Sequence, residues 1–248
     1  MAKLRAVFWD VDGTLADTEM EGHRVAFNEA FAAGGFPWQW DRQTYGDLLS
    51  IPGGGARIKA FASQQGRELD DQVLSRLKAM KHASYKQRIR SGQVSWRPGV
   101  RRLLRELTAA GLQQWIVTTS GHDSVQELLS NAFPDGDAPF KGWITAEDVS
   151  RRKPDPEAYQ QALAASGVSA SEGLAFEDSK AGLASATAAG LACLLTPAPW
   201  DLDLAGQLDQ AVAVVDHLGD PDQPCTLISG PPCAEAKITL EYLQNLKR

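Results

Sequence analysis

The chain has 248 residues, of which 43% are hydrophobic, and its formal net charge at pH 7 is −6. This length is ample for a hydrophobic core but long for one compact unit, so we expect a domain with an insertion. The negative charge argues against a nucleic-acid partner, because phosphate backbones bind basic surfaces.

The first predicted element is a buried strand at residues 4–9, which leads directly into Asp10-Val11-Asp12-Gly13-Thr14. The two aspartates therefore emerge at the carboxyl end of a strand, where open α/β sheets bind their ligands. Asp10 can attack phosphorus, while Asp12 can protonate the leaving oxygen and later activate water. We expect Gly13 to allow a tight bend and the Thr14 hydroxyl to orient Asp12. An ordinary acidic turn is the alternative.

The pattern becomes helical over residues 17–96, without a convincing buried strand, which predicts an α-helical cap inserted after the first strand. Glu19 and His23 lie at the hinge into its first helix. Lys81 lies on a later helix beside apolar residues, where a solvated surface lysine is the alternative.

A Gly-rich turn that opens a helix offers bare amides and a guanidinium to an anion; it comprises Gly53, Gly54, Gly55, Ala56 and Arg57. A flexible loop with a solvated arginine is the alternative there. We assign Trp38, Trp40 and Tyr45 to the core of this cap, with contacts to a ligand as the alternative.

Residues 97–248 complete the predicted core domain, and over about 97–216 strand and helix patterns alternate. Together with residues 1–16 they predict an α/β fold, a doubly wound, Rossmann-like parallel sheet with helices on both faces. Further strands are expected at 112–118, 143–146, 173–177, 191–195 and 211–215, and helices at 99–110 and 234–247 with a loop at 217–233 between the last strand and the last helix.

Within this alternating region lie three more groups of polar residues that could take part in catalysis. Thr118, Thr119, Ser120 and Gly121 follow a predicted strand and open a helix, so their hydroxyls and amides suit a phosphoryl group, although such residues are also common in loops. Lys153 would be a cation beside the nucleophile, and most lysines are simply solvated. Asp155 and Pro156 after it are expected to be the N-cap and first residue of a helix.

The last group is Glu177 and Asp178, a second acidic pair at the end of another apolar strand. Carboxylate oxygens are the ligands that Mg²⁺ prefers. We expect Asp10, Asp178 and the backbone carbonyl of Asp12 to hold the ion, with Glu177 acting through a water molecule.

These four motifs resemble, in content and order, those of the haloacid dehalogenase superfamily of aspartate-nucleophile phosphatases. A narrower resemblance, to the CbbY-type sugar bisphosphate phosphatases of photosynthetic organisms, extends over most of the chain. It rests on residues 17–28, Trp40-Asp41, residues 45–49, residues 53–58 and Gly219-Asp220-Pro221.

That resemblance implies hydrolysis of xylulose-1,5-bisphosphate, an inhibitor of Rubisco. It implies Asp10 as nucleophile, Asp12 as acid and base, and Asp10, Asp12 and Asp178 as metal ligands. The implied substrate contacts are Glu19, residues 53–57, residues 118–121 and Lys153; Lys81 matches a cap lysine of the related β-phosphoglucomutases. The chain departs from the pattern at Gly55-Ala56, where relatives usually carry Lys-Glu, so two charges are missing.

Phosphoglycolate phosphatase and β-phosphoglucomutase are alternatives with the same core. A haloacid dehalogenase would need neither Asp12 nor the acidic pair, and a binding protein on an inactive scaffold would generally lack a catalytic carboxylate. No apolar run approaches the roughly 20 residues that span a bilayer. Three cysteines, an odd number, fit a reducing cytoplasm. The resemblance adds that chloroplast-targeted plant relatives carry a transit extension, which is not seen before the first strand here, so we expect a bacterial or cyanobacterial cytoplasm. We expect a monomeric cytoplasmic enzyme that uses Mg²⁺ and a small phosphorylated sugar.

Overall fold

The computed structural model describes residues 3–51, 53–198 and 208–246. The chain divides into two compact units. The core unit comprises Met1–Asp17 and Trp96–Arg248, and the helical unit comprises Thr18–Ser95. Within the described residues, no helix has both the length and the apolar character needed to cross a membrane.

The described part of the core unit contains a seven-stranded sheet in the order β3-β2-β1-β4-β5-β6-β7. Neighbouring strands are parallel, except that β6 and β7 are antiparallel. The strands are β1 (Ala6–Trp9), β2 (Gln113–Val117), β3 (Gly142–Ile144), β4 (Gly173–Glu177), β5 (Ala192–Leu195), β6 (Ala213–Val215) and β7 (Leu227–Ser229). The first six begin and end within two residues of their predicted positions.

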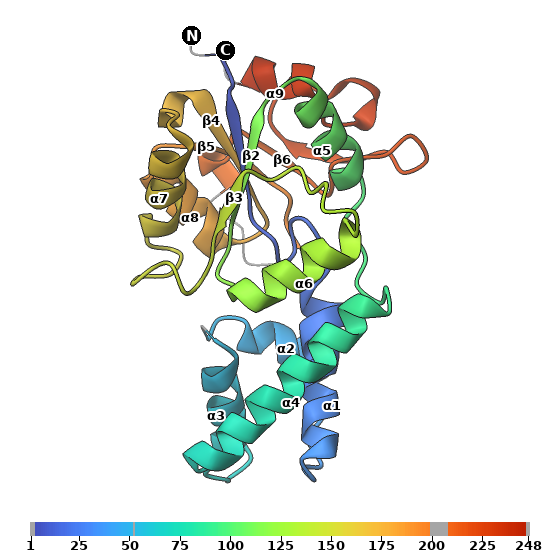
Figure 1. Ribbon diagram of the computed structural model, residues 1–248, viewed down its shortest axis with the longest axis vertical. Helices are drawn as coiled ribbons and strands as arrows, with labels where there is room; N and C mark the ends of the chain where they lie inside the picture. The colour runs from blue at the N-terminus through green and yellow to red at the C-terminus, as the bar shows by residue number, and fades with distance from the viewer. Residues whose placement is uncertain (1–2, 52, 199–207, 247–248) are drawn as a thin grey trace. The chain divides into compact units, whose positions relative to one another are not determined.

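Helices cover both faces of this sheet, as Figure 1 shows, with α7 and α8 on one side and α5 and α9 on the other. The helices of the core unit are α5 (Val100–Ala109), α6 (His122–Ala132), α7 (Glu157–Ser166), α8 (Lys180–Ala188) and α9 (Leu240–Leu246). The doubly wound α/β fold is therefore confirmed. The chain first runs from β1 to β2 and β3, then crosses to β4 on the other side, so β1 lies at the switch point where such sheets bind ligands.

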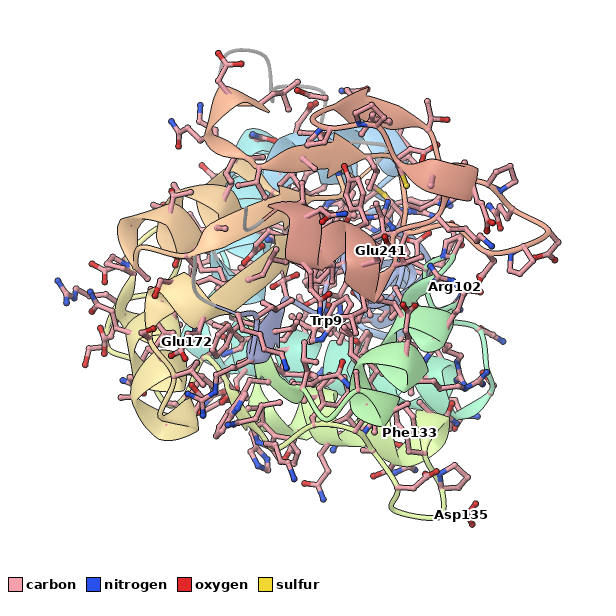
Figure 2. The ribbon with its side chains drawn as sticks, turned by 90° about the horizontal axis from the view of Figure 1, so that it is seen from above. Trp9, Arg102, Phe133, Asp135, Glu172 and Glu241 are labelled. Atoms are coloured by element: carbon pink, nitrogen blue, oxygen red, sulfur yellow. The ribbon has the colours of Figure 1, made fainter. Side chains whose placement is uncertain are left out.

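The central strand is buried because both of its faces are covered. All four residues of β1 are fully inaccessible to solvent, which explains why it is a continuous apolar run rather than an alternating one. The ring of Trp9 stacks on Phe176 at 4.2 Å, and its Nε1 donates to Gln114 Oε1 at 3.2 Å. Trp9 lies in the middle of the unit in Figure 2. The position of the residue that follows, Asp10, is thus held by the surrounding core.

The C-terminal part differs from the prediction in two places. β7 lies inside the segment expected to be a loop, and two of its three residues are exposed, so it has no burial pattern that a sequence could reveal. The last helix begins at Leu240 rather than at residue 234. Glu235 and Ala236 have φ angles of 55° and 49°, a left-handed conformation that interrupts an α-helix.

The helical unit is held together by an aromatic core. It consists of a π-helical turn (Glu19–His23), α1 (Arg24–Ala33), α2 (Arg42–Leu48), α3 (Gly54–Gln64) and α4 (Asp71–Arg90). Trp40 is fully buried and contacts the rings of Phe27, Phe31 and Phe61 at centroid distances of 4.7, 4.9 and 5.5 Å. Within residues 18–51 and 53–95 the structure contains no strand, as predicted.

Candidate active site

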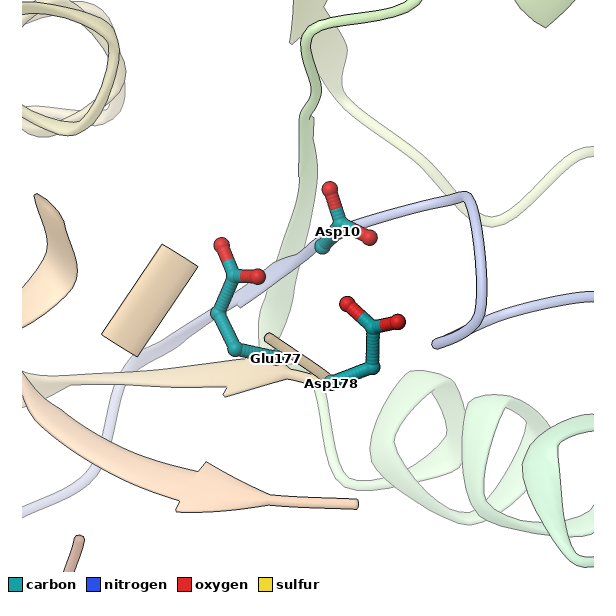
Figure 3. A group of neighbouring side chains, drawn as sticks. All are labelled: Asp10, Glu177 and Asp178. Atoms are coloured by element: carbon teal, nitrogen blue, oxygen red, sulfur yellow. The ribbon is translucent and has the colours of Figure 1, made fainter. Parts of the chain in front are cut away.

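Three buried carboxylates meet at the switch point of the sheet. Asp10 follows β1, whereas Glu177 ends β4 and Asp178 follows it. One oxygen of each lies within 4.8 Å of the others, and Figure 3 shows the three side chains converging from the two strand ends. The backbone N–H of Asp10 donates to the carbonyl of Phe176 at 3.0 Å. Because β1 and β4 are paired, their carboxyl ends bring together residues 167 positions apart in the sequence.

Lys153 is the cation of this cluster, although it is distant from the other members in sequence. Its Nζ donates to Asp10 Oδ1 at 2.7 Å and to the carbonyl of Val117 at 2.8 Å, and it lies 2.6 Å from Glu177 Oε1. These three acceptors match the three protons of an ammonium group. Burial alone would lower the pKa of Lys153, but Asp10 and Glu177 outweigh it and raise the pKa above its ordinary value. Lys153 is therefore not a solvated lysine and carries its charge at neutral pH.

Burial lowers the pKa of a lysine but raises the pKa of a carboxyl group, because in both cases it disfavours the charged form. Burial raises the pKa of Asp10 to about 7, against the lowering effect of Lys153. The pKa of Asp178 is held well above its ordinary value, chiefly by burial and by the neighbouring charges of Asp10 and Glu177. Lys153 therefore offsets only part of the cost of ionising these carboxyl groups, and additional positive charge beside them would favour their ionised form.

The donor set fits a divalent metal ion. All its donors are carboxylate oxygens, the type of ligand that Mg²⁺ prefers. The three carboxylates would carry more negative charge, when ionised, than the single adjacent Lys153 can neutralise. Glu177 Oε2 is buried and has no hydrogen-bond partner. Gly13 has a φ of +89°, and a Cβ there would overlap with Asp178 Oδ2, so the glycine both turns the chain and leaves room for this carboxylate. The cluster of Asp10, Glu177 and Asp178 could therefore bind a metal.

Asp12 is oriented by a different residue from the one predicted. The Ser120 hydroxyl donates to Asp12 Oδ2, while the buried Thr14 hydroxyl has no hydrogen-bond partner. The prediction that Thr14 orients Asp12 is therefore wrong. Thr118 supports the arrangement, since its Oγ1 accepts the backbone N–H of Ser120 at 3.0 Å. Pairing of β2 beside β1 brings this loop to Asp12, which local sequence does not reveal.

The remaining residues of this loop lead into α6. Thr119 is exposed, and Gly121 is the N-cap. The carboxylate of Glu147 accepts the first helical N–H, that of His122, at 3.0 Å. One amide at this helix end is thus occupied by a protein carboxylate. α7 begins at Glu157, one residue later than predicted, and Asp155 Oδ1 accepts its N–H at 3.0 Å.

Two residues near the cluster were not predicted from the sequence. The Arg97 guanidinium donates to the carbonyl oxygens of Gly13, of Thr196 at 2.6 Å and of Asp216 at 2.5 Å, so it ties the turn after Asp12 to the segments after β5 and β6. Tyr159 donates its hydroxyl to Glu177 Oε1. The position of Tyr159 among alanines on α7 is typical of a core residue, and only the tertiary contact reveals its hydroxyl partner.

Two groups of predicted residues lie together within the helical unit. Tyr45 is fully buried, and its hydroxyl donates to Glu19 Oε2 at 2.5 Å and accepts from Arg57 Nη1 at 3.4 Å. His23 Nδ1 lies 2.9 Å from Lys81 Nζ. Trp40 is a core residue as predicted, Trp38 is only partly buried, and Tyr45 combines a core ring with a polar contact. The π-helical turn that contains Glu19 and His23 is a feature often found at functional sites.

The glycine-rich segment opens α3, as predicted. Gly53 is the N-cap with a φ of 88°, which favours glycine, and a Cβ on Gly54 would lie 2.9 Å from the Phe27 ring. Gly55 is half-buried and Ala56 exposed. Arg57 donates from Nε to the carbonyl of Ile51 at 2.9 Å, so it is anchored rather than solvated.

The fold and the site together consist of a doubly wound sheet with buried carboxylates and a lysine at its switch point. This arrangement is consistent with a hydrolase, and comparison with known proteins identifies the family. Residues 4–190 match the family of haloacid dehalogenase-like hydrolases, and the chain belongs to that family. It is thus an enzyme, a phosphatase of the aspartate-nucleophile type.

Within this family, the chain is similar to several CbbY proteins in sequence and in structure. Protein CbbY of Rhodobacter capsulatus is 42% identical over 200 residues, which are 80% of this chain and 87% of that protein. Plasmid-encoded CbbY of Cupriavidus necator is 35% identical over 228 residues, 89% of this chain and 88% of that protein. The crystal structure of a CbbY mutant from Rhodobacter sphaeroides in complex with xylulose-1,5-bisphosphate superposes with a TM-score of 0.78 at 32% identity, and covers 88% of this chain and 96% of that one.

Proposed function

We propose that the chain is a Mg²⁺-dependent sugar bisphosphate phosphatase that converts xylulose-1,5-bisphosphate to xylulose 5-phosphate. The observation that carries this proposal is the buried group of Asp10, Lys153, Glu177 and Asp178 at the switch point of the sheet. The bound sugar in the similar CbbY structure supports the choice of substrate.

The proposed reaction begins with attack of Asp10 on phosphorus. An Asp10 oxygen forms a bond to phosphorus as the bond to the sugar oxygen breaks, and Asp12 donates its proton to that oxygen. The ionised Asp12 then takes a proton from water, whose oxygen displaces Asp10 from the phosphoryl group and releases inorganic phosphate. Lys153 neutralises charge on Asp10 and on the phosphoryl oxygens.

The residues that would hold Mg²⁺ are Asp10, Asp178 and the Asp12 backbone carbonyl, with Glu177 acting through water. The ion would supply positive charge to the transferring phosphoryl group. Thr118, Thr119, Ser120 and Gly121 would bind that group through hydroxyls and amides. Ser120 already lies against Asp12, which supports its place in the site.

The helical unit is proposed to bind the second phosphate. Arg57 would supply a forked donor and the amides at the start of α3 further N–H groups. These amides belong to Gly53, Gly54, Gly55 and Ala56. Glu19, His23 and Lys81 would contact the rest of the sugar phosphate. The shared contact of Glu19 and Arg57 with Tyr45 supports a preorganised binding site.

A phosphate-release screen with Mg²⁺ tests this proposal. The substrates are xylulose bisphosphate, ribulose bisphosphate, phosphoglycolate and the hexose phosphates of mutase chemistry; we expect fastest turnover of the first. Faster turnover of phosphoglycolate, or interconversion of hexose phosphates, would replace the proposed substrate by one of these alternatives.

Asp10→Asn tests the nucleophile. It should abolish turnover and labelling by beryllofluoride, since the amide cannot form the acyl phosphate. Asp135→Asn is the matched control, because Asp135 is an exposed aspartate in the loop after α6 (Figure 2). Residual turnover by Asp10→Asn at the control's rate would refute the assignment of Asp10.

The biological role proposed is removal of a Rubisco inhibitor by a monomeric cytoplasmic enzyme. Sedimentation in solution tests the monomer. Loss of carbon-fixation rate in cells that lack the protein tests the role.

A further inference from the structure

Tyr159 is a buried polar residue that the proposed reaction does not use. It is the third residue of α7 and has no exposed surface. Its ring belongs to the hydrophobic core cluster that also contains Ala6, Val117, Ala175 and Cys193. Its hydroxyl donates to Glu177 Oε1. A buried tyrosine needs some partner for its hydroxyl, but this partner belongs to the catalytic cluster.

Glu177 Oε1 connects Tyr159 to the catalytic lysine. The same oxygen lies 2.6 Å from Lys153 Nζ, which in turn lies 2.7 Å from Asp10 Oδ1. The hydrogen bonds therefore run from Tyr159 through Glu177 and Lys153 to Asp10. Lys153 Nζ also lies 5.3 Å from the centre of the Tyr159 ring. The end of the long lysine side chain is thus held by contacts from β2, β4, α7 and the residue after β1.

A second element lies against the other oxygen of the Glu177 carboxylate. A Cβ on Gly182, in the first turn of α8, would overlap with Glu177 Oε2. The carboxylate therefore lies between the Tyr159 hydroxyl and the α8 backbone, with no exposed surface. A carboxylate confined on both sides has little freedom to rotate, and its direction determines where Lys153 can bind.

We propose that Tyr159 is a positioning residue for catalysis, which acts through Glu177 to hold Lys153 against the nucleophile, and that Gly182 completes this support. The inference rests on the proposed role of Asp10 and Lys153 in phosphoryl transfer. It is independent of which sugar phosphate the enzyme prefers. A purely structural tyrosine would affect stability alone.

Tyr159→Phe removes the hydroxyl and keeps the ring. We expect kcat to fall at least tenfold, equivalent to about 1.4 kcal/mol, with KM changed less than twofold. The substrate is p-nitrophenyl phosphate, whose hydrolysis needs only the phosphoryl chemistry. Tyr242→Phe is the matched control, because Tyr242 is also buried and donates to a backbone carbonyl, that of Pro231, at 2.9 Å. It should lower the melting temperature comparably and leave kcat unchanged.

A double-mutant cycle separates positioning from general damage. In a Lys153→Arg background, Tyr159→Phe should reduce kcat less than twofold further, because the lysine it positions is gone. Equal fold-losses in both backgrounds would overturn the inference. Gly182→Ala, which displaces the same carboxylate from the other side, should reproduce both results and replaces Tyr159→Phe if that variant fails to fold.

Crystal structures provide a result that needs no substrate. In Tyr159→Phe we expect Lys153 Nζ to leave hydrogen-bond distance of Asp10. An unchanged lysine would overturn the inference even if the wild-type chain proved inactive on every sugar phosphate. Conversely, a displaced lysine with no preference for xylulose bisphosphate would leave the inference standing and refute only the proposed substrate.

Discussion

The raised pKa of Asp10 predicts how stability depends on pH when no metal is bound. The folded-state pKa is about 7 and the ordinary value 3.8, a difference worth on the order of 4 kcal/mol. Because the folded protein holds the proton more tightly, it binds more protons than the unfolded chain between these two values. The contribution of Asp10 to stability should therefore fall as pH rises from about 4 to about 7 and become level above that.

Asp10→Asn isolates this contribution, since the amide is close in shape and does not titrate. The free energy of unfolding is measured in urea, with a chelator present, for both proteins between pH 5 and pH 8. The variant's advantage over wild type should grow by about 1.4 kcal/mol for each pH unit up to about pH 7. Saturating Mg²⁺ should stabilise wild type more at pH 8 than at pH 6, because binding requires the ionised carboxylate. A difference between the two proteins that does not change with pH would refute the reasoning.

Three further predictions concern substitutions at single residues. Lys153→Met should reduce kcat by about 100- to 1,000-fold, and a smaller effect than that of the exposed Lys59→Met would contradict its role. Arg57→Ala should raise KM for bisphosphates about tenfold, as loss of a charge-assisted hydrogen bond implies; an equal change for monophosphates would remove the second-phosphate site. Gly53→Ala should cost roughly 1–2 kcal/mol of stability, measured by urea unfolding, because φ is 88°. Gly46→Ala within α2, where a Cβ meets nothing within 4 Å, should instead stabilise, and destabilisation of similar size in both would contradict the backbone explanation.

Much of the core unit could be predicted because its signals are local. Six strands appear as short apolar runs with polar residues at their carboxyl ends, and a buried parallel strand needs no more than that. β7 could not be predicted, since Ile228 is 52% exposed and the strand is defined only by pairing with β6. The late start of α9 depends on the left-handed backbone at Glu235 and Ala236. Glutamate and alanine rarely adopt this conformation, so the sequence does not predict it there.

The candidate site divides in the same way. Asp10, Glu177 and Asp178 stand at strand ends, and parallel pairing necessarily brings such ends to one edge. The hydroxyl that orients Asp12 could not be predicted, since Thr14 and Ser120 are equally capable donors and only the packing of the loop after β2 selects Ser120. Tyr159 and Arg97 have ordinary local sequences, and their partners lie 18 residues and more away.

The sequence by itself therefore determined the fold class, the position of the acidic groups at the ends of predicted strands, and the chemistry those groups can perform, because periodicity and residue type act over a few neighbouring positions. Tertiary structure alone decided which hydroxyl bonds to which carboxylate, and that Lys153 lies between Asp10 and Glu177. The physical reason is that burial couples charges distant along the chain, and such coupling depends on distances in space that no local pattern encodes.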